Sequence, residues 1–89
     1  MKSHMTDEFR DAFTALPPEV QQQARAAYAL FQDTPHHPSL HFKRLRSTQI
    51  AYTVRVGLHY RALAYEEQGE LYWFWIGSHA TYDQLIKHL

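Results

Sequence analysis

The hydrophobic spacing of this chain changes once, and the change falls at a short segment rich in proline and histidine, residues 33–39. Before this segment, apolar residues recur about every three to four positions, which is the period of a helix with one buried face. After it, apolar and polar residues alternate, which is the period of a half-buried strand. A chain in which helices come first and strands follow is typical of an α+β domain, with the helices covering one face of an antiparallel sheet.

Two short helices are expected before the change. Thr6 can cap the first one because its hydroxyl accepts a first-turn N–H, and apolar residues then follow at helical spacing as far as Leu16. The proline pair at 17–18 ends this helix and starts a second one, which runs from 19 to about 32. The two helices are therefore predicted to form a hairpin.

Four strands and a short terminal helix are expected after the change. The last strand is apolar on both faces, so we place it inside the sheet. The predicted fold class is α+β, with an N-terminal helical hairpin packed on a four-stranded antiparallel sheet and a short C-terminal helix. The strands are predicted at 40–45, 50–56, 59–65 and 71–76, and the terminal helix at 80–88.

Length and amino-acid composition limit the number of domains and exclude several kinds of site. A chain of 89 residues forms one domain with one thin core. Residues 1–5 read Met-Lys-Ser-His-Met, which we interpret as an expression-tag remnant, so the domain is expected over 6–89. The absence of cysteine excludes disulfides and thiolate sites and favours a reducing cytoplasm. The longest apolar run, at 72–76, is too short for a transmembrane helix, so no membrane partner is expected.

Charge is unevenly distributed, although 9 Lys+Arg and 9 Asp+Glu cancel over the whole chain. The segment 34–65, which covers most of the predicted sheet, contains no Asp or Glu. Its cations either form a face that holds phosphates or protect edge strands from aggregation. These cations are Lys43, Arg44, Arg46, Arg55 and Arg61.

Three histidines are candidate functional residues. His37 and His41 are four residues apart, but Pro38 prevents a shared helix and no cysteine or nearby acid completes a tetrahedral set. No metal site is therefore expected. His79 follows a buried strand, where an imidazole can be held rigidly yet remain open to solvent, with Tyr82 within one turn. His79 is either a structural residue or a group that moves protons.

Three stretches of the chain resemble the RelE/ParE superfamily of bacterial toxins, which belong to type II toxin–antitoxin modules. They are residues 37–45 (HPSLHFKRL), 52–63 (YTVRVGLHYRAL) and 73–83 (WFWIGSHATYD). The resemblance extends from about Pro18 to the last residue, and the second and third stretches are its most specific parts.

The resemblance to the RelE-like branch implies an endoribonuclease that cuts messenger RNA in the ribosomal A site without a metal or other cofactor. In that reaction the ribose 2′-hydroxyl attacks the adjacent phosphate. The implied catalytic residues are Arg61, His79 and Tyr82. The implied RNA-binding residues are Lys43, Arg44, Arg46 and Arg55.

The resemblance also implies the partners of the protein. They are a cognate antitoxin and the ribosome with its messenger RNA, and the assembly is either a homodimer or a toxin–antitoxin hetero-oligomer. The alternative is a non-enzymatic protein of the same fold, because ParE-like members lack the nuclease residues and inhibit DNA gyrase. A detoxified homologue that only binds its antitoxin belongs to the same alternative. Fold alone does not separate these functions.

Overall fold

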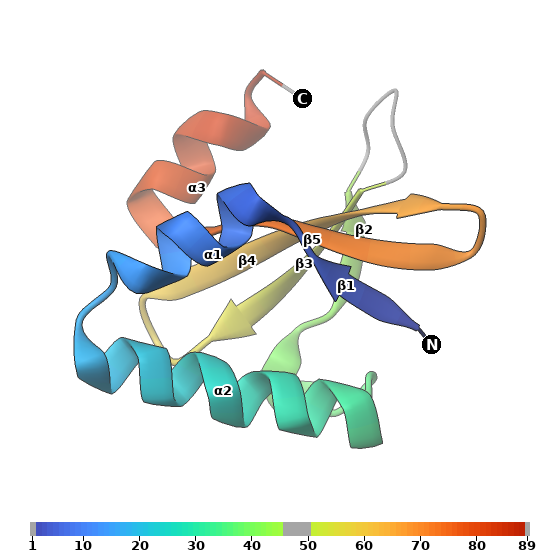
Figure 1. Cartoon of the computed structure of the whole chain (residues 1–89), viewed down its shortest axis with the longest axis horizontal. Coiled ribbons are helices and arrows are strands. Elements are labelled where there is room, and N and C mark those ends of the chain that lie inside the picture. The colour runs from blue at the N-terminus through green and yellow to red at the C-terminus, as the bar shows by residue number, and fades with distance from the viewer. Residues whose placement is uncertain (1, 46–50, 89) are drawn as a thin grey trace.

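A computed structural model describes residues 2–45 and 51–88 and shows a 5-stranded sheet with α-helices on both of its faces (Figure 1). The α+β class predicted from the sequence is confirmed. The elements are β1 (Ser3–Met5), α1 (Asp7–Thr14), α2 (Pro18–Asp33), a 3₁₀ helix η1 (Pro38–Leu40), β2 (Lys43–Leu45), β3 (Ala51–Val56), β4 (Tyr60–Glu67), β5 (Glu70–Ser78) and α3 (His79–Ile86).

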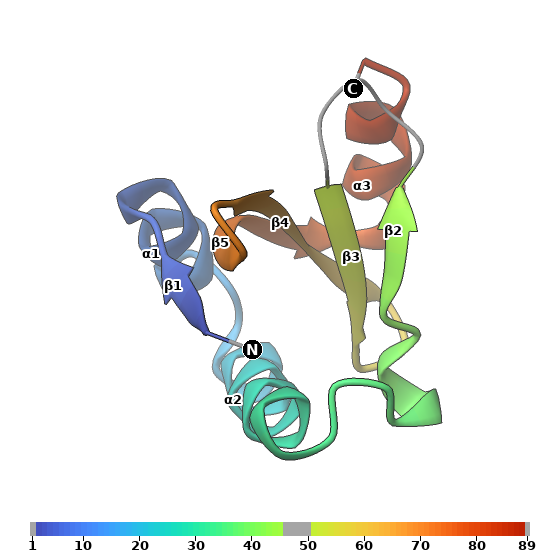
Figure 2. The ribbon, with the colours of Figure 1, turned by 90° about the vertical axis from the view of Figure 1, so that its right-hand side faces the viewer.

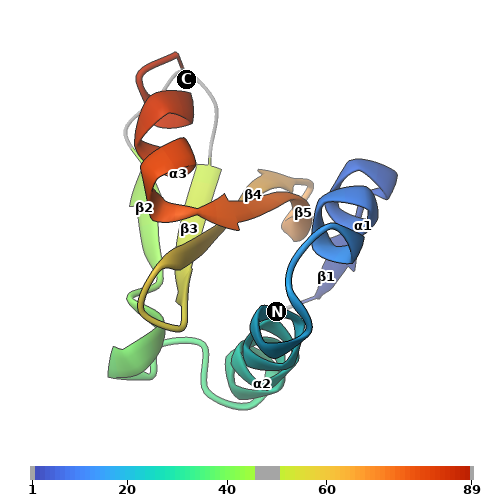
Figure 3. The same ribbon diagram turned by 90° about the vertical axis from the view of Figure 1, so that its left-hand side faces the viewer.

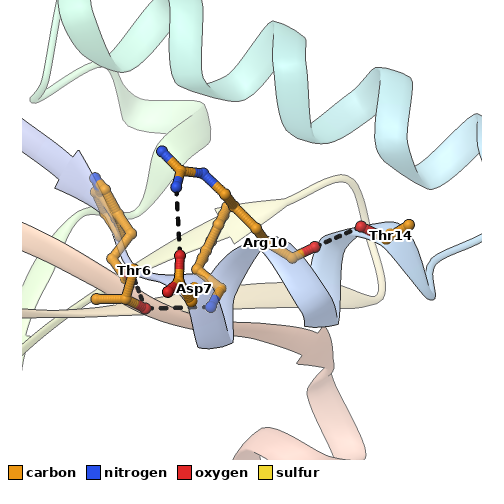
Figure 4. A network of polar contacts seen from close by, with 6 residues as sticks. Thr6, Asp7, Arg10 and Thr14 are labelled. Atoms are coloured by element: carbon orange, nitrogen blue, oxygen red, sulfur yellow. Dashed lines mark hydrogen bonds and ion pairs between the residues drawn. The ribbon is translucent and has the colours of Figure 1, made fainter.

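The first helix begins where its capping residue predicts. The hydroxyl of Thr6 accepts a hydrogen bond from the backbone N–H of Phe9 at 3.2 Å and lies 3.1 Å from the carbonyl oxygen of Trp73, to which it donates. Figure 4 shows this cap together with the Asp7–Arg10 contact of 3.5 Å on the exposed side of α1. Thr6 therefore both starts α1 and ties it to β5.

The strands follow the order β1-β5-β4-β3-β2, and all neighbours are antiparallel except β1 and β5. β1 pairs in parallel with β5, in the register Ser3↔Leu71. The sequence predicts only four strands, because residues 1–5 are interpreted there as a tag remnant; the origin of these residues stays a prediction. β5 lies inside the sheet, as predicted from its two apolar faces. The His4 imidazole, 2.8 Å from the Glu70 carboxylate, lowers the pKa of Glu70.

The first helix ends at Thr14 instead of Leu16, and the terminal helix covers His79–Ile86 instead of 80–88. Larger differences occur at the start of β2 and at the turn between β4 and β5. The strand predicted at 40–45 is reduced to β2, because Pro38 begins η1 and the ring of His37 accepts from the backbone N–H of Ser39 at 3.2 Å. The interval between the strands predicted at 59–65 and 71–76 is reduced to a turn of Gln68 and Gly69, whose φ angles are 52° and 78°. Positive φ at both positions is what a two-residue type I′ hairpin requires, so β4 and β5 extend further than expected.

Helices α1 and α2 lie together on one side of the twisted sheet, and α3 lies on the other (Figures 2 and 3). The inner face, which meets α1 and α2, carries the buried side chains of Val54, Val56, Ala62, Trp73 and Ile76. An apolar cavity of about 450 Å³ remains between the two helices and this face. By alternation along the strands, the opposite or outer face carries Thr53, Arg55, Arg61 and Leu63. None of the described helices is both long and apolar enough to cross a membrane.

Candidate functional site

A row of four residues crosses the outer face of the sheet at the start of β4. Arg55 on β3 stands directly opposite Arg61 on β4, and Arg61 stands opposite Gly77 on β5. His41, two residues before β2, meets Arg55 through its side chain, with Nε2 3.4 Å from Nη1 of the arginine. We call His41, Arg55, Arg61 and Gly77 the arginine row.

The three residues with implied catalytic roles lie together at one end of this row. The Nε of Arg61 donates a hydrogen bond to Nδ1 of His79 at 3.2 Å. The guanidinium carbon of Arg61 lies 5.5 Å from the ring centroid of Tyr82, and the His79 ring stacks on the same tyrosine at 5.7 Å. Tyr82 is 6% exposed, and its buried ring packs against both the Arg61 guanidinium and the His79 imidazole.

His79 is held by the start of α3. Ser78 caps this helix through its hydroxyl, which accepts from the backbone N–H of Thr81 at 3.2 Å. The backbone N–H of His79 donates to the carbonyl oxygen of His59 at 2.7 Å, which ties the helix start to the turn before β4. The imidazole stays open to solvent, with a side chain 50% exposed and Nε2 3.6 Å from a carboxylate oxygen of Asp83. The backbone is thus fixed while the ring remains accessible.

The other end of the row has a second arginine–histidine contact. The Nη1 of Arg55 lies 3.4 Å from Nε2 of His41, and its Nε donates to the carbonyl oxygen of Gly57 at 3.0 Å. Each arginine of the row therefore contacts one imidazole. Because a guanidinium only donates hydrogen bonds, the contacted ring nitrogen must be the acceptor in both cases.

The electrostatics of the row favour an anion. Like charges directly opposite each other in a sheet destabilise it, and Arg55 and Arg61 are such a pair. Within residues 2–45 and 51–88, neither arginine forms an ion pair with an acid. The Nη1 of Arg61 is buried and has no hydrogen-bond partner among the described residues. Guanidinium groups bind phosphate oxygens through their N–H donors, so a phosphate beside the two arginines would offset their charge and accept from their accessible donors.

The four residues implied to bind RNA are not all on one surface. Arg55 belongs to the arginine row, and Lys43 is exposed on the same outer face, where it pairs with Thr53. Arg44 pairs with Tyr52, whose ring packs against the core, so Arg44 lies on the inner side of the sheet. Burial and then the hydrogen bond to Glu66 raise the pKa of Tyr52 there. Arg46 lies outside the described residues.

Sequence reasoning missed the part that His41 plays in this surface. From the sequence, His41 is weighed as a metal ligand beside His37 and as one of the histidines that flank the basic sheet, without a contact to Arg55. The structure brings His41 to Arg55 and, in the part of the chain that it describes, groups no three histidine or acidic side chains for a metal. The apolar cavity lies on the opposite, inner face and contributes nothing to this site.

Gly77 is the one member of the arginine row without a side chain, and the indole of Trp75 fills the space beside it. A Cβ at this residue would lie 2.5 Å from Cζ2 of Trp75. We expect Gly77→Ala to lower the free energy of unfolding by about 1–3 kcal/mol, because the rigid indole must move. Since β5 leads directly into His79, we also expect the activity of the site to fall. Urea denaturation and an activity assay on the same preparation measure the two effects.

Gly69→Ala is the matched control for this change. Gly69 has a φ of 78° and nothing within 4 Å of an added Cβ, so the alanine strains only the backbone. The expected cost is about 1–2 kcal/mol, at the opposite end of β5 from His79. An equal loss of activity in both variants would show that stability alone, and not the position of His79, explains the effect.

A comparison with protein families gives a match over most of the chain. Residues 18–84 match the ParE-like toxin domain. No curated protein matches the sequence. The match covers all three stretches on which the resemblance to bacterial toxins rests.

Solved structures share the fold at low sequence identity. The toxin–antitoxin complex RelB–RelE from Methanococcus jannaschii aligns with a TM-score of 0.71 and 12% identity, over 91% of this chain and 95% of that one. YafQ from Escherichia coli aligns with a TM-score of 0.71 and 10% identity, over 91% and 96%. The RelBE2 toxin–antitoxin complex from Mycobacterium tuberculosis aligns with a TM-score of 0.59 and 22% identity, over 86% and 95%. These likenesses establish a RelE-like fold.

Proposed function

The chain belongs to the ParE-like toxin domain family and is a toxin of the RelE/ParE superfamily, and from this premise we propose that it is a ribosome-dependent endoribonuclease that cuts messenger RNA in the cytoplasm. The observation that carries the proposal is the contact between Arg61 and His79. It joins a phosphate-binding guanidinium to a group that can transfer a proton near neutral pH.

The proposed reaction uses the RNA itself as the nucleophile. The 2′-oxygen of a ribose forms a bond to the adjacent phosphorus, and the bond from phosphorus to the 5′-oxygen of the next nucleotide breaks. The products are a 2′,3′-cyclic phosphate and a free 5′-hydroxyl. The 2′-hydroxyl loses a proton and the leaving 5′-oxygen gains one, so no metal or cofactor is required for balance.

Each residue of the site has a part in this proposal. Arg61 and Arg55 hold the non-bridging oxygens and offset the charge that grows on phosphorus. His79 protonates the leaving 5′-oxygen. In the free protein its Nδ1 accepts from Arg61, and that nitrogen becomes available when phosphate replaces it as the acceptor for Arg61. The buried ring of Tyr82 positions Arg61 and His79, and Lys43 holds the RNA backbone beside them.

Toe-printing of messenger RNA on ribosomes tests this function. After induction of the wild-type protein, we expect translation to stop and new 5′-hydroxyl ends to appear within the A-site codon. A ParE-like inhibitor of gyrase would instead induce the response to DNA damage and leave messenger RNA uncut. A detoxified homologue would give neither phenotype.

We also propose a cognate antitoxin as the partner, because two of the similar structures are toxin–antitoxin complexes. An acidic segment that covers Arg55 and Arg61 would supply the carboxylates that these residues lack in the described part of the chain. We expect the affinity to fall about tenfold or more between roughly 50 and 500 mM salt.

Isothermal titration of the purified pair at both salt concentrations measures this fall. Arg55→Gln is expected to weaken binding and to reduce its dependence on salt, whereas Arg25→Gln on the opposite side of the sheet provides the matched control. An affinity that does not change with salt would contradict an electrostatic cover of the arginine row.

A further inference from the structure

Each of the two arginines in the arginine row contacts a different histidine. His41 contacts Arg55 at 3.4 Å, and His79 contacts Arg61 at 3.2 Å. The two arginines are direct cross-strand neighbours, so a phosphate that both of them hold would lie between the two histidines. This arrangement matters because phosphodiester cleavage by a 2′-hydroxyl needs one group that removes a proton and another that supplies one.

The backbone around His41 is fixed, although its side chain is exposed. His41 follows η1 in the left-handed conformation, with a φ of 47°, and its backbone N–H donates to the carbonyl oxygen of Pro38 at 3.3 Å. Histidine is among the residues that tolerate this conformation, which directs the chain from η1 into β2. The fixed backbone brings the imidazole within 3.4 Å of Arg55.

The hydrogen-bond pattern decides which ring nitrogen faces the phosphate position. Arg55 can only donate, so Nε2 of His41 is the acceptor and carries the lone pair. That lone pair points toward the arginine pair. When Arg55 turns its donors to a phosphate, Nε2 of His41 is left free beside the bound anion.

We propose that His41 is a second catalytic residue of this site, the base that takes the proton of the 2′-hydroxyl. The inference rests on the proposed function. The proton passes from the 2′-oxygen to Nε2 of His41 as the bond to phosphorus forms. His79 gives a proton to the 5′-oxygen as its bond to phosphorus breaks. Afterwards His41 is protonated and His79 neutral, and exchange with water restores both.

The charges beside each ring decide which histidine is the base and which is the acid. A carboxylate oxygen of Asp83 lies 3.6 Å from His79, where it can pair with an imidazolium. Both histidines contact an arginine, but His41 has no such carboxylate beside it among the residues that the structure describes, and the segment 34–65 that surrounds it in sequence contains no acid. A neutral base is therefore suited to the position of His41, and a protonated acid to that of His79.

The first experiment replaces His41 in the full chain and measures cleavage of messenger RNA on programmed ribosomes. His41→Asn is the main variant, because asparagine tolerates the left-handed backbone and has no nitrogen that accepts a proton at neutral pH. We expect the cleavage rate to fall by roughly 100-fold to 10,000-fold. His88→Asn, an exposed histidine near the end of α3, is the matched control and should cleave at the wild-type rate. Circular dichroism checks that both variants are folded.

A second experiment separates the base from the acid. It uses a messenger RNA with sulfur in place of the 5′-oxygen at the bond that the wild type cuts, because a thiolate leaves without receiving a proton. We expect this RNA to restore cleavage by His79→Ala and not by His41→Asn.

Three results would each overturn a different statement. Wild-type cleavage of ordinary RNA by His41→Asn would show that His41 has no catalytic role. Rescue of His41→Asn by the sulfur-containing RNA would show that His41 is not the base. Failure of the wild type to cut ordinary messenger RNA would overturn the proposed function itself.

Discussion

Replacing either Arg61 or His79 by alanine is expected to abolish the growth arrest that the wild-type protein causes, while the fold is retained. The two side chains contact each other at 3.2 Å, so both act on the same phosphodiester in the proposed reaction. Loss of a proton donor slows such a reaction by roughly 100-fold to 10,000-fold, and loss of a charge that stabilises the transition state has an effect of similar size. Growth after induction and toe-printing of messenger RNA measure the two consequences.

Two variants outside the site serve as controls. Arg10→Ala removes an exposed arginine on α1, and His88→Ala removes an exposed histidine after α3, so each matches one of the catalytic changes in kind. Both should remain toxic and should differ in stability from the wild type by no more than about 0.5 kcal/mol. Undiminished toxicity of both Arg61→Ala and His79→Ala would eliminate the assignment of this site.

The largest expected loss of stability comes from Phe31→Ala. Phe31 is 2% exposed and lies edge to face with Phe42 at 5.0 Å and with Trp73 at 5.4 Å. It therefore joins α2 both to the segment before β2 and to β5. Truncation of a buried phenylalanine costs about 3–5 kcal/mol, which is a large share of the stability of a domain of this size.

Urea denaturation followed by circular dichroism measures this loss. Gln32→Ala, at the next and exposed position of α2, should change the free energy of unfolding by less than about 0.5 kcal/mol. A loss below about 1 kcal/mol for Phe31→Ala would show that the contact between α2 and the sheet is loosely packed, because truncation of a well-packed aromatic lowers the free energy of unfolding by more than this.

Local signals in the sequence predicted most of the fold. The hydroxyl of Thr6 marks the start of α1 and the proline pair at 17–18 marks the start of α2, and the structure confirms both starts. The end of α1 lies at Thr14, before the prolines. The alternation in β3 and the apolar faces of β5 predicted the strands and the interior position of β5. The resemblance to RelE/ParE toxins is confirmed by the family match.

Features that depend on distant residues were not predictable. β1 forms a strand because it pairs with β5, which lies near the other end of the sequence. Nothing within residues 3–5 indicates this pairing. The contact of His41 with Arg55 depends on the register between β2 and β3. The position of Arg44 on the inner side depends on the same register, because a shift by one residue exchanges the two faces of a strand. The roles of Arg61, His79 and Tyr82 stay predictions, although their side chains lie together.

The parallel pairing of β1 with β5 also bears on how fast the protein acquires its structure. Ser3 and Leu71 are partners in this pairing, so the chain must close a loop over most of its length before the strands can join. Such contacts between remote residues raise the contact order and slow folding relative to that of helical domains of equal size. The hairpin of β4 and β5 closes through a two-residue turn and has no such delay. Docking of β1 is thus expected to be a late event, in the millisecond-to-second range of domains rich in non-local strand pairs.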